Sequence, residues 1–200
     1  KENIVAYKDL SEIDKYVMIK LRDLIAEVKE SYDTFRFDNI YRLVNNYITQ
    51  FLSAFYLDFS KDILYIEKAD DIKRRSVQTV LYENCLSLVK LLAPIIPFTT
   101  EEVFKYLIGE TSVHLTDIPE IKEYPEENEI KDKYDKFMEL RDDVLKALEE
   151  ARNRKIIGKS FTAKVTLYPD QNTRSFLNTL HADLRQIFIV SQLEIKDFSM

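Results

Sequence analysis

Aromatic and charged side chains that can bind RNA gather between residues 56 and 75. Single-stranded RNA is bound by stacking its bases on aromatic rings, while lysine and arginine hold the phosphates and polar groups contact the base edges. The stretch supplies all three kinds of group: Tyr56, Asp58, Lys61, Asp62, Tyr65, Lys73, Arg74 and Arg75. It therefore predicts an RNA-contacting surface. The alternative is that the tyrosines belong to the core or its rim and the three cations form a solvated first helical turn.

A second group of cations follows a predicted helix near residue 150. No acidic residue lies between residues 152 and 164, a range that contains Arg152, Arg154, Lys155 and Lys159. These residues can form a second positive surface for RNA. They can equally complement the negative end of the helix dipole, which is a purely structural role.

No residues in the sequence are spaced as a catalytic or metal centre requires. His114 and His181 lie far apart and outside any metal-ligand pattern, and Cys85 is the single cysteine, so neither a disulfide framework nor a multi-cysteine zinc site is expected. Two glycines cannot build a phosphate-cradling loop. We therefore expect no catalytic residue, no metal ligand and no bound cofactor in this chain.

The composition favours a soluble, mainly helical protein of the cytoplasm. Glycine is scarce while aliphatic and charged residues dominate. The longest apolar runs fall short of the ~18 residues that a membrane span needs. A net charge of −6 argues against indiscriminate nucleic-acid binding but leaves room for local basic surfaces.

Hydrophobic periodicity predicts four helices in the first part of the chain. The first covers about residues 10–28, with Ser11 and Asp14 resembling a capping box. The second, rich in aromatics, runs from 37 to 55 and fades near Asp58, and residues 59–71 show no helical period. The third covers 72–91, and a fourth is expected to start with a capping box at Thr99 and to end at Gly109. Short links between them predict an up-and-down bundle.

The chain divides at an acidic, proline-containing segment. We expect a helical bundle over residues 1–116, an exposed linker over 117–129 and a second part over 130–200. The second part should hold a long helix around 137–151, a strand at 165–167, a helix at 173–180 and a strand at 189–195. The fold class is therefore mainly α, with a small α/β module after the bundle.

Three runs of sequence resemble one protein family. The run from Leu91 to Phe104 (LLAPIIPFTTEEVF) resembles the L-L-A-P-x-x-P-F-x-x-E-E-[IV]-[WF] signature of the helical anticodon-binding domain of class I aminoacyl-tRNA synthetases for aliphatic amino acids. The run from Tyr56 to Tyr65 resembles the Y-L-D-x-x-K-D-x-L-Y run of the bacterial isoleucine enzymes in that family. Residues 147–153, 157–160 and 165–168 resemble the segment that follows the bundle in the same enzymes.

The resemblance implies a tRNA-binding role within a larger enzyme. Such an enzyme attaches isoleucine to its tRNA with ATP and magnesium, and this part would grip the anticodon arm. The ATP-handling H-I-G-H and K-M-S-K-S runs and an editing domain have no counterpart here. We therefore expect a C-terminal fragment whose partners are isoleucine tRNA and the upstream catalytic domain of the same chain, acting as a monomer. A cysteine-rich zinc module is expected beyond this fragment or not at all.

Roles for the individual residues follow from their type and position. Cations in the first group would hold phosphates, Tyr56 and Tyr65 would stack on or flank bases, and Asp58 and Asp62 would accept hydrogen bonds from base amino groups. The second cation group would meet the anticodon stem. Two other functions remain open: a helical adaptor whose aromatic second helix offers a groove to a protein partner, and the equivalent fragment of a valine or leucine enzyme. The run from Tyr56 to Tyr65 argues against the last.

Overall fold

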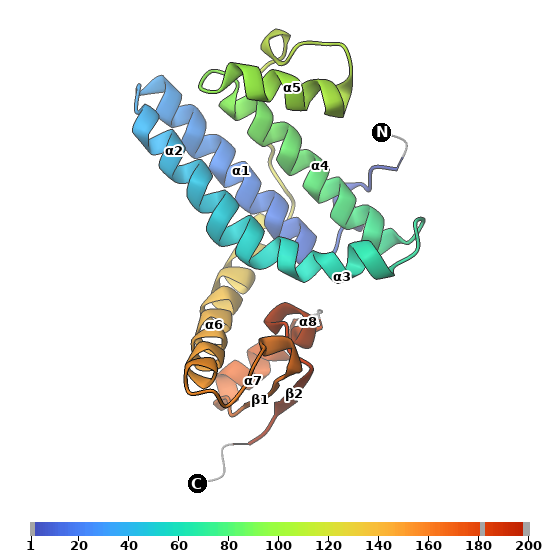
Figure 1. Cartoon of the computed structure of the whole chain (residues 1–200), viewed down its shortest axis with the longest axis vertical. Coiled ribbons are helices and arrows are strands. Elements are labelled where there is room, and N and C mark those ends of the chain that lie inside the picture. Colours follow the sequence, from blue (N-terminus) through green and yellow to red (C-terminus); the bar gives the residue numbers. More distant parts are fainter. Residues whose placement is uncertain (1–2, 181–182, 198–200) are drawn as a thin grey trace. The chain divides into compact units, whose positions relative to one another are not determined.

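The computed structural model describes residues 3–180 and 183–197, and the chain splits into two compact units, Lys1–Lys131 and Asp132–Met200 (Figure 1). No helix in the described ranges is both long enough and apolar enough to cross a membrane.

The first unit is a helical bundle, which confirms the predicted fold class. Helix α1 packs against α2 and α4, and α5 packs on α4 (Figure 1). Its elements are a short 3₁₀ turn (Tyr7–Asp9), α1 (Glu12–Asp33), α2 (Phe37–Asn46), a π-helix (Tyr47–Leu57), α3 (Asp58–Ile66), α4 (Ile72–Leu92), α5 (Pro97–Ile108) and a second 3₁₀ turn (Val113–Leu115).

Helix α1 begins where its cap predicts. The Ser11 hydroxyl accepts a hydrogen bond from the Asp14 backbone N–H (3.2 Å) and donates one to the Asp14 carboxylate (2.8 Å). Such a cap satisfies a backbone donor that has no partner inside the helix. The apolar residues at steps of three and four then form the buried side of the helix, among them Ile13, Val17 and Val28.

The second helical run continues past the predicted end at Asp58, and the expectation of non-helical structure from Phe59 is wrong up to Ile66. Rings spaced four residues apart hold this run against the bundle. Neighbouring ring centroids lie 5.4 Å apart for Tyr47 and Phe51, 5.6 Å for Phe51 and Phe55, and 6.5 Å for Phe55 and Phe59. Because Phe59 extends this row of rings, the charged residues after it occupy the outer face of a helix.

Helix α5 begins at Pro97 and not at a cap on Thr99. Proline fits the first helical position because its missing N–H has no partner there. Thr100 instead donates its hydroxyl to the Ile96 carbonyl (2.9 Å), so the predicted capping box is wrong. The predicted end at Gly109 is confirmed, since this glycine has a φ of 114° that other residues rarely adopt.

The acidic segment before α6 lies along the first unit. The Tyr124 ring stacks on Tyr7 with centroids 4.3 Å apart, and Lys122 pairs with Glu83 at 3.5 Å. Burial raises the pKa of both tyrosines to about 12. Helix α6 (Glu127–Asn153) begins ten residues before the predicted helix, and an ion pair of Glu127 with Arg22 at 2.9 Å fixes its first turn.

The second unit holds the remaining turns of α6 and the expected α/β module. It contains a short 3₁₀ turn (Ser160–Thr162), β1 (Lys164–Leu167), α7 (Gln171–Leu177), α8 (Leu184–Phe188) and β2 (Gln192–Ile195). The two strands are parallel, with Lys164 opposite Gln192. The helices therefore lie in the crossover that parallel strands require.

The core of the second unit lies between α6 and α8. Phe137 and Phe188 pack with ring centroids 5.7 Å apart, and the buried Arg141 donates to the Ile187 carbonyl at 3.3 Å. Helix α8 was not predicted. The second strand begins at Gln192 and not at Ile189, because Ile189 has the left-handed conformation (φ 55°) that ends α8.

Candidate nucleic-acid interface

The exposed face of α3 carries four of the residues that the sequence assigns to RNA. Asp58, Lys61, Asp62 and Tyr65 are spaced by three or four residues, so they share one side of the helix, while Phe59 on the opposite side is buried. The Tyr65 ring is 86% exposed. Together with the exposed Lys73 at the start of α4, these four residues form what we call the α3–α4 surface.

The α3–α4 surface offers the groups that a single-stranded nucleotide requires. Tyr65 presents an aromatic face for stacking, and Asp62 presents a hydrogen-bond acceptor for base amino groups. Lys61 lies 3.3 Å from the Asp58 carboxylate, and both side chains are about half exposed. An exposed pair of this kind contributes only about 0–1 kcal/mol, so a phosphate can replace the carboxylate as the partner of Lys61.

Tyr56 does not belong to this surface, which corrects its predicted role. Its exposed fraction is 0%, and its hydroxyl donates a hydrogen bond of 2.6 Å to the Asp14 carboxylate. Burial raises the pKa of Tyr56 well above its usual value and also raises the pKa of Asp14, although the hydrogen bonds to Asp14 oppose that rise. A ring enclosed in the core cannot stack on a base, so Tyr56 is a structural residue.

The three cations at the start of α4 have different surroundings. Arg74 donates to the Glu67 carbonyl at 3.0 Å and so ties α4 to the end of α3, while Arg75 donates to the Gln78 side chain at 3.1 Å. Both are half-buried, whereas Lys73 is exposed. Asp71 caps α4 by accepting the Lys73 backbone N–H at 2.8 Å, which places an anion beside this cationic first turn.

Two exposed isoleucines beside the α3–α4 surface were missed by sequence reasoning. Ile66 ends α3 and Ile72 begins α4, and both side chains lie in solvent. Ile72 opens the predicted helix over residues 72–91, but its side chain does not lie on the buried side of α4. The sequence does contain a signal for them: Ile66 and Ile72 are branched apolar residues on either side of a short polar turn that includes Lys68. They extend the apolar area on which bases can rest.

The second group of cations lies where α6 ends. Arg152 pairs with Glu149 at 2.7 Å and donates to the Ser160 hydroxyl at 3.0 Å, and Arg154 lies 3.7 Å from Glu150. Glu149 and Glu150 come just before residues 152–164, which contain no acidic residue, and they neutralise part of the positive charge of that range.

The other two cations of this group lie in the loop after the helix. Lys155 closes the helix in the left-handed conformation (φ 57°), and the Lys159 ammonium lies 5.4 Å from the Phe161 ring centroid. The second group is thus a helix end with exposed cations, and its electrostatic field is weaker than the sequence suggests.

Much of the aromatic second helix is buried in the core of the first unit. Its rings at Tyr47 and Phe55 are buried in the bundle, and Tyr47 donates a hydrogen bond of 2.6 Å to Asn84 on α4. Burial raises the pKa of the Tyr47 hydroxyl above its usual range. The aromatic residues that suggested an adaptor are therefore divided: Tyr47 and Phe55 belong to the core, while Phe37 and Tyr41 are exposed, and the adaptor stays an untested alternative.

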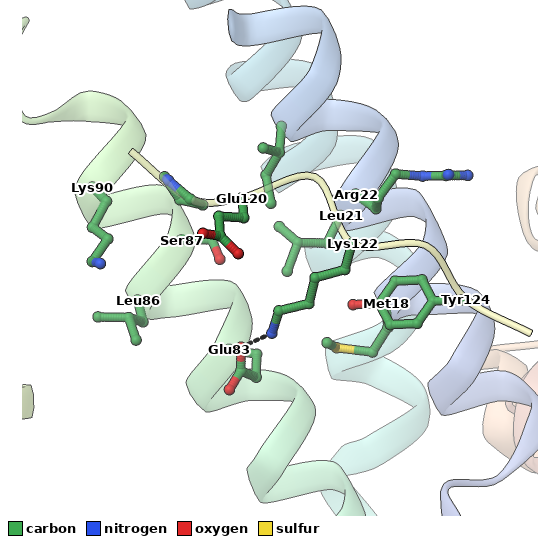
Figure 2. Close-up of a pocket in the computed structure, with 12 residues that line it drawn as sticks. Met18, Leu21, Arg22, Glu83, Leu86, Ser87, Lys90, Glu120, Lys122 and Tyr124 are labelled. Atoms are coloured by element: carbon green, nitrogen blue, oxygen red, sulfur yellow. Dashed lines mark ion pairs between the residues drawn. The ribbon is translucent and has the colours of Figure 1, made fainter. Parts of the chain in front are cut away.

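A pocket of about 300 Å³ lies between α1, α4 and the segment before α6 (Figure 2). Met18 and Leu21 form an apolar wall, and Lys122 reaches toward Glu83 at its edge (Figure 2). Three cations (Arg22, Lys90 and Lys122) and two acids (Glu83 and Glu120) line it. Because Arg22 pairs with Glu127 and Lys122 with Glu83, the pocket offers little excess positive charge to a phosphate.

The described residues contain no group of three histidine, cysteine, aspartate or glutamate side chains arranged for a metal ion. His181 lies outside the described residues. Cys85 is half-buried on α4, and burial raises the pKa of its thiol, which disfavours the reactive thiolate.

Comparison with known proteins supplies the family. Residues 14–167 match the family model for the anticodon-binding domain of tRNA ligase. The chain is 53% identical over 195 residues to the isoleucine–tRNA ligase of Listeria welshimeri, 52% identical over 198 residues to that of Lactobacillus acidophilus and 50% identical over 196 residues to that of Bacillus cereus. These alignments cover 96%, 98% and 97% of the chain but only 21% of each relative. The chain therefore belongs to the family of anticodon-binding domains of tRNA ligases.

Proposed function

We propose that this chain is the part of an isoleucine–tRNA ligase that binds the anticodon arm of isoleucine tRNA. The observation that carries the proposal is identity of 50–53% along nearly the whole chain with isoleucine enzymes from three genera. The α3–α4 surface supports it, because that surface joins an exposed ring to exposed cations and acceptors.

The proposal assigns the chain a selective role and no chemical step. Base edges that meet the wrong hydrogen-bonding partner leave buried polar groups unpaired, which is costly, so a binding surface can discriminate between tRNAs by itself. Activation of isoleucine with ATP and magnesium, and transfer to the tRNA, belong to the catalytic domain of the same longer polypeptide. That polypeptide acts in the cytoplasm as a monomer, and any zinc module lies elsewhere in it.

A charging assay tests the amino-acid identity. The longer polypeptide that carries this chain is incubated with ATP, magnesium, total tRNA and radiolabelled isoleucine, leucine or valine. We expect labelled isoleucine to accumulate on tRNA while leucine and valine do not. Stable attachment of leucine or valine instead would reassign the chain to a sibling enzyme, and the 200-residue chain alone serves as the control that should charge nothing.

A further inference from the structure

A second pocket, of about 360 Å³, lies beside the first half of α4, and we call it the α4 pocket. Its lining consists of Asn3, Ile4, Arg75, Gln78, Thr79 and Tyr82. The α4 residues among them are three or four positions apart, so they share one face of the helix. The volume lies within the range of about 300–1,000 Å³ that small ligands occupy, which is ample for one nucleobase.

Hydrogen bonds hold the N-terminal segment beside α4 (Figure 1). The Thr79 hydroxyl accepts the Val5 backbone N–H at 3.0 Å and donates to the Arg75 carbonyl at 2.8 Å. Thr79 is itself buried, so water competes little for these two bonds. Asn3 and Ile4, which directly precede Val5, therefore form a fixed wall of the α4 pocket before any ligand binds.

The polar side chains of the α4 pocket offer mainly hydrogen-bond donors. Arg75 donates one bond to the Gln78 side-chain carbonyl at 3.1 Å, which leaves its other guanidinium N–H groups and the Gln78 amide NH₂ to a ligand. Both side chains are half-buried. Among the residues that the structure describes, no carboxylate pairs with Arg75. The pocket therefore suits a ligand that presents neighbouring acceptors.

Guanine is the base whose edge matches these donors. It presents two neighbouring acceptors, O6 and N7, and an arginine that donates to both is the commonest specific contact with a base. Adenine and cytosine carry an amino group in place of O6, which would face the donors of Arg75 and Gln78. Tyr82 and Ile4 add aromatic and apolar surface against which the faces of a planar ring can rest.

We propose that the α4 pocket binds an unpaired guanine of the tRNA anticodon loop, with Arg75 and Gln78 donating to its O6 and N7. The proposal rests on the proposed function. It changes the role predicted for Arg75 from phosphate binding to recognition of a base edge, and it adds Gln78 and Tyr82 to the residues that select the tRNA. Lys73, exposed at the start of the same helix, stays available for a phosphate.

Removal of a single acceptor atom from the tRNA tests the proposal. Isoleucine tRNA is prepared with 7-deazaguanine, which lacks N7, in place of each guanine of the anticodon loop in turn. Its affinity for the longer ligase polypeptide is measured by fluorescence anisotropy. One of these replacements should weaken binding about tenfold, the size expected for loss of a specific base contact. If no replacement weakens binding, no guanine N7 is recognised and the proposal is wrong.

Variants of the longer polypeptide assign that contact to the α4 pocket. In Arg75→Met with Gln78→Leu the sensitive replacement should cost less than about twofold, because the donors are already gone. Arg42→Met with Gln50→Leu makes the same changes at exposed positions on the second helical run and should keep the tenfold cost. A tenfold cost in both variants would show that the N7 contact lies elsewhere.

A milder change covers the case in which the double variant does not fold. Gln78→Glu keeps the size of the side chain and its bond from Arg75, but it replaces the amide donor with an acceptor. This variant should bind native tRNA more weakly than the parent, and the sensitive 7-deazaguanine replacement should reduce its affinity little further. Unchanged affinity of Gln78→Glu for native tRNA would overturn the proposal.

The charging assay keeps the two proposals apart. Isoleucine charging, together with tRNA binding that is insensitive to every guanine N7 of the loop, refutes guanine binding in the α4 pocket alone. Charging of leucine or valine refutes the isoleucine assignment alone if binding of the tRNA that is charged depends on one guanine N7 and on Arg75 and Gln78.

Discussion

Two tyrosines nine positions apart show what decides function at the scale of single residues. Tyr56 and Tyr65 have the same side chain and similar neighbours in sequence, but one hydroxyl is bonded to a buried carboxylate and the other ring lies in solvent. Composition could not separate them, because the difference is one of helical phase. Once α3 is known to be a helix, its period assigns Tyr65 to the outer face.

The contrast predicts opposite effects of two substitutions. Tyr65→Ala should weaken tRNA binding by about 1–3 kcal/mol, the loss typical of one aromatic stack, and leave stability unchanged. Tyr56→Phe should lower the free energy of unfolding by about 1–3 kcal/mol, because it removes one of the two hydroxyls, those of Tyr56 and Ser11, that donate to the buried Asp14 carboxylate. Fluorescence anisotropy with labelled tRNA and urea unfolding measure the two quantities. Reduced tRNA affinity in folded Tyr56→Phe would return that residue to the binding site.

The buried Asp14 predicts a particular dependence of stability on pH. Burial raises the pKa of Asp14 in the folded protein above its usual value of 3.8. Protonation of Asp14 therefore stabilises the folded protein fully at pH values below the pKa of Asp14 in the unfolded chain. This stabilisation is lost as the pH rises through the pKa of Asp14 in the folded protein. Asp14→Asn should consequently become more stable relative to the parent chain as pH increases from about 4 to about 7.

Urea unfolding at several pH values measures that difference. Asp9→Asn, which changes an exposed carboxylate just before α1, is the control and should show no such trend. The free energy of unfolding of the parent chain is compared with that of Asp14→Asn at each pH. A difference that stays constant with pH would contradict the raised pKa of Asp14.

At the scale of elements, the sequence predicts those helices whose ends carry clear signals. Ser11 and Gly109 mark ends correctly, and the strand at residues 164–167 follows from its alternating pattern. Helix α3 was missed because charged residues after Asp58 obscure its apolar side. The start of α5 was misplaced because Thr99 and Glu102 imitate a cap that Pro97 makes unnecessary.

The cap of α4 supplies a prediction at this scale. Asp71→Ala should lower the free energy of unfolding by about 0.5–2 kcal/mol, because it removes the acceptor of the Lys73 N–H. Asp70→Ala changes the neighbouring exposed aspartate and should have an effect near zero. Equal destabilisation by both changes, measured by urea unfolding, would mean that charge and not capping holds this end.

At the scale of the whole molecule, the chain has two cores of different kinds. The first unit buries aromatic and aliphatic side chains between helices, and the second packs α6 and α8 through Phe137 and Phe188. The helical hydrophobic period predicted the helical bundle of the first unit, and the alternating period predicted the strand of the α/β module in the second. The interactions of the segment before α6 were not predictable, because an acidic, proline-containing sequence is typical of a linker and does not show that Tyr124 stacks on Tyr7.

Separate cores predict separate responses to core mutations. Phe137→Ala should destabilise the second unit by about 3–5 kcal/mol and speed amide hydrogen exchange there, while α1 and α4 keep their protection. Phe55→Ala should do the reverse, since Phe55 is buried in the first unit. Loss of protection across both units in either variant would show that they unfold as one.

Selective binding of an anticodon arm is the main function proposed for this chain, and its most direct test is the affinity of the chain for isoleucine tRNA transcripts with native and exchanged anticodons. We predict tighter binding to the native transcript, with both affinities falling as salt concentration rises because phosphate contacts release counterions. Lys61→Ala with Lys73→Ala should reduce the salt dependence, while Lys105→Ala on α5 should not. Equal affinity for the two transcripts at every salt concentration would contradict selective anticodon binding by this chain.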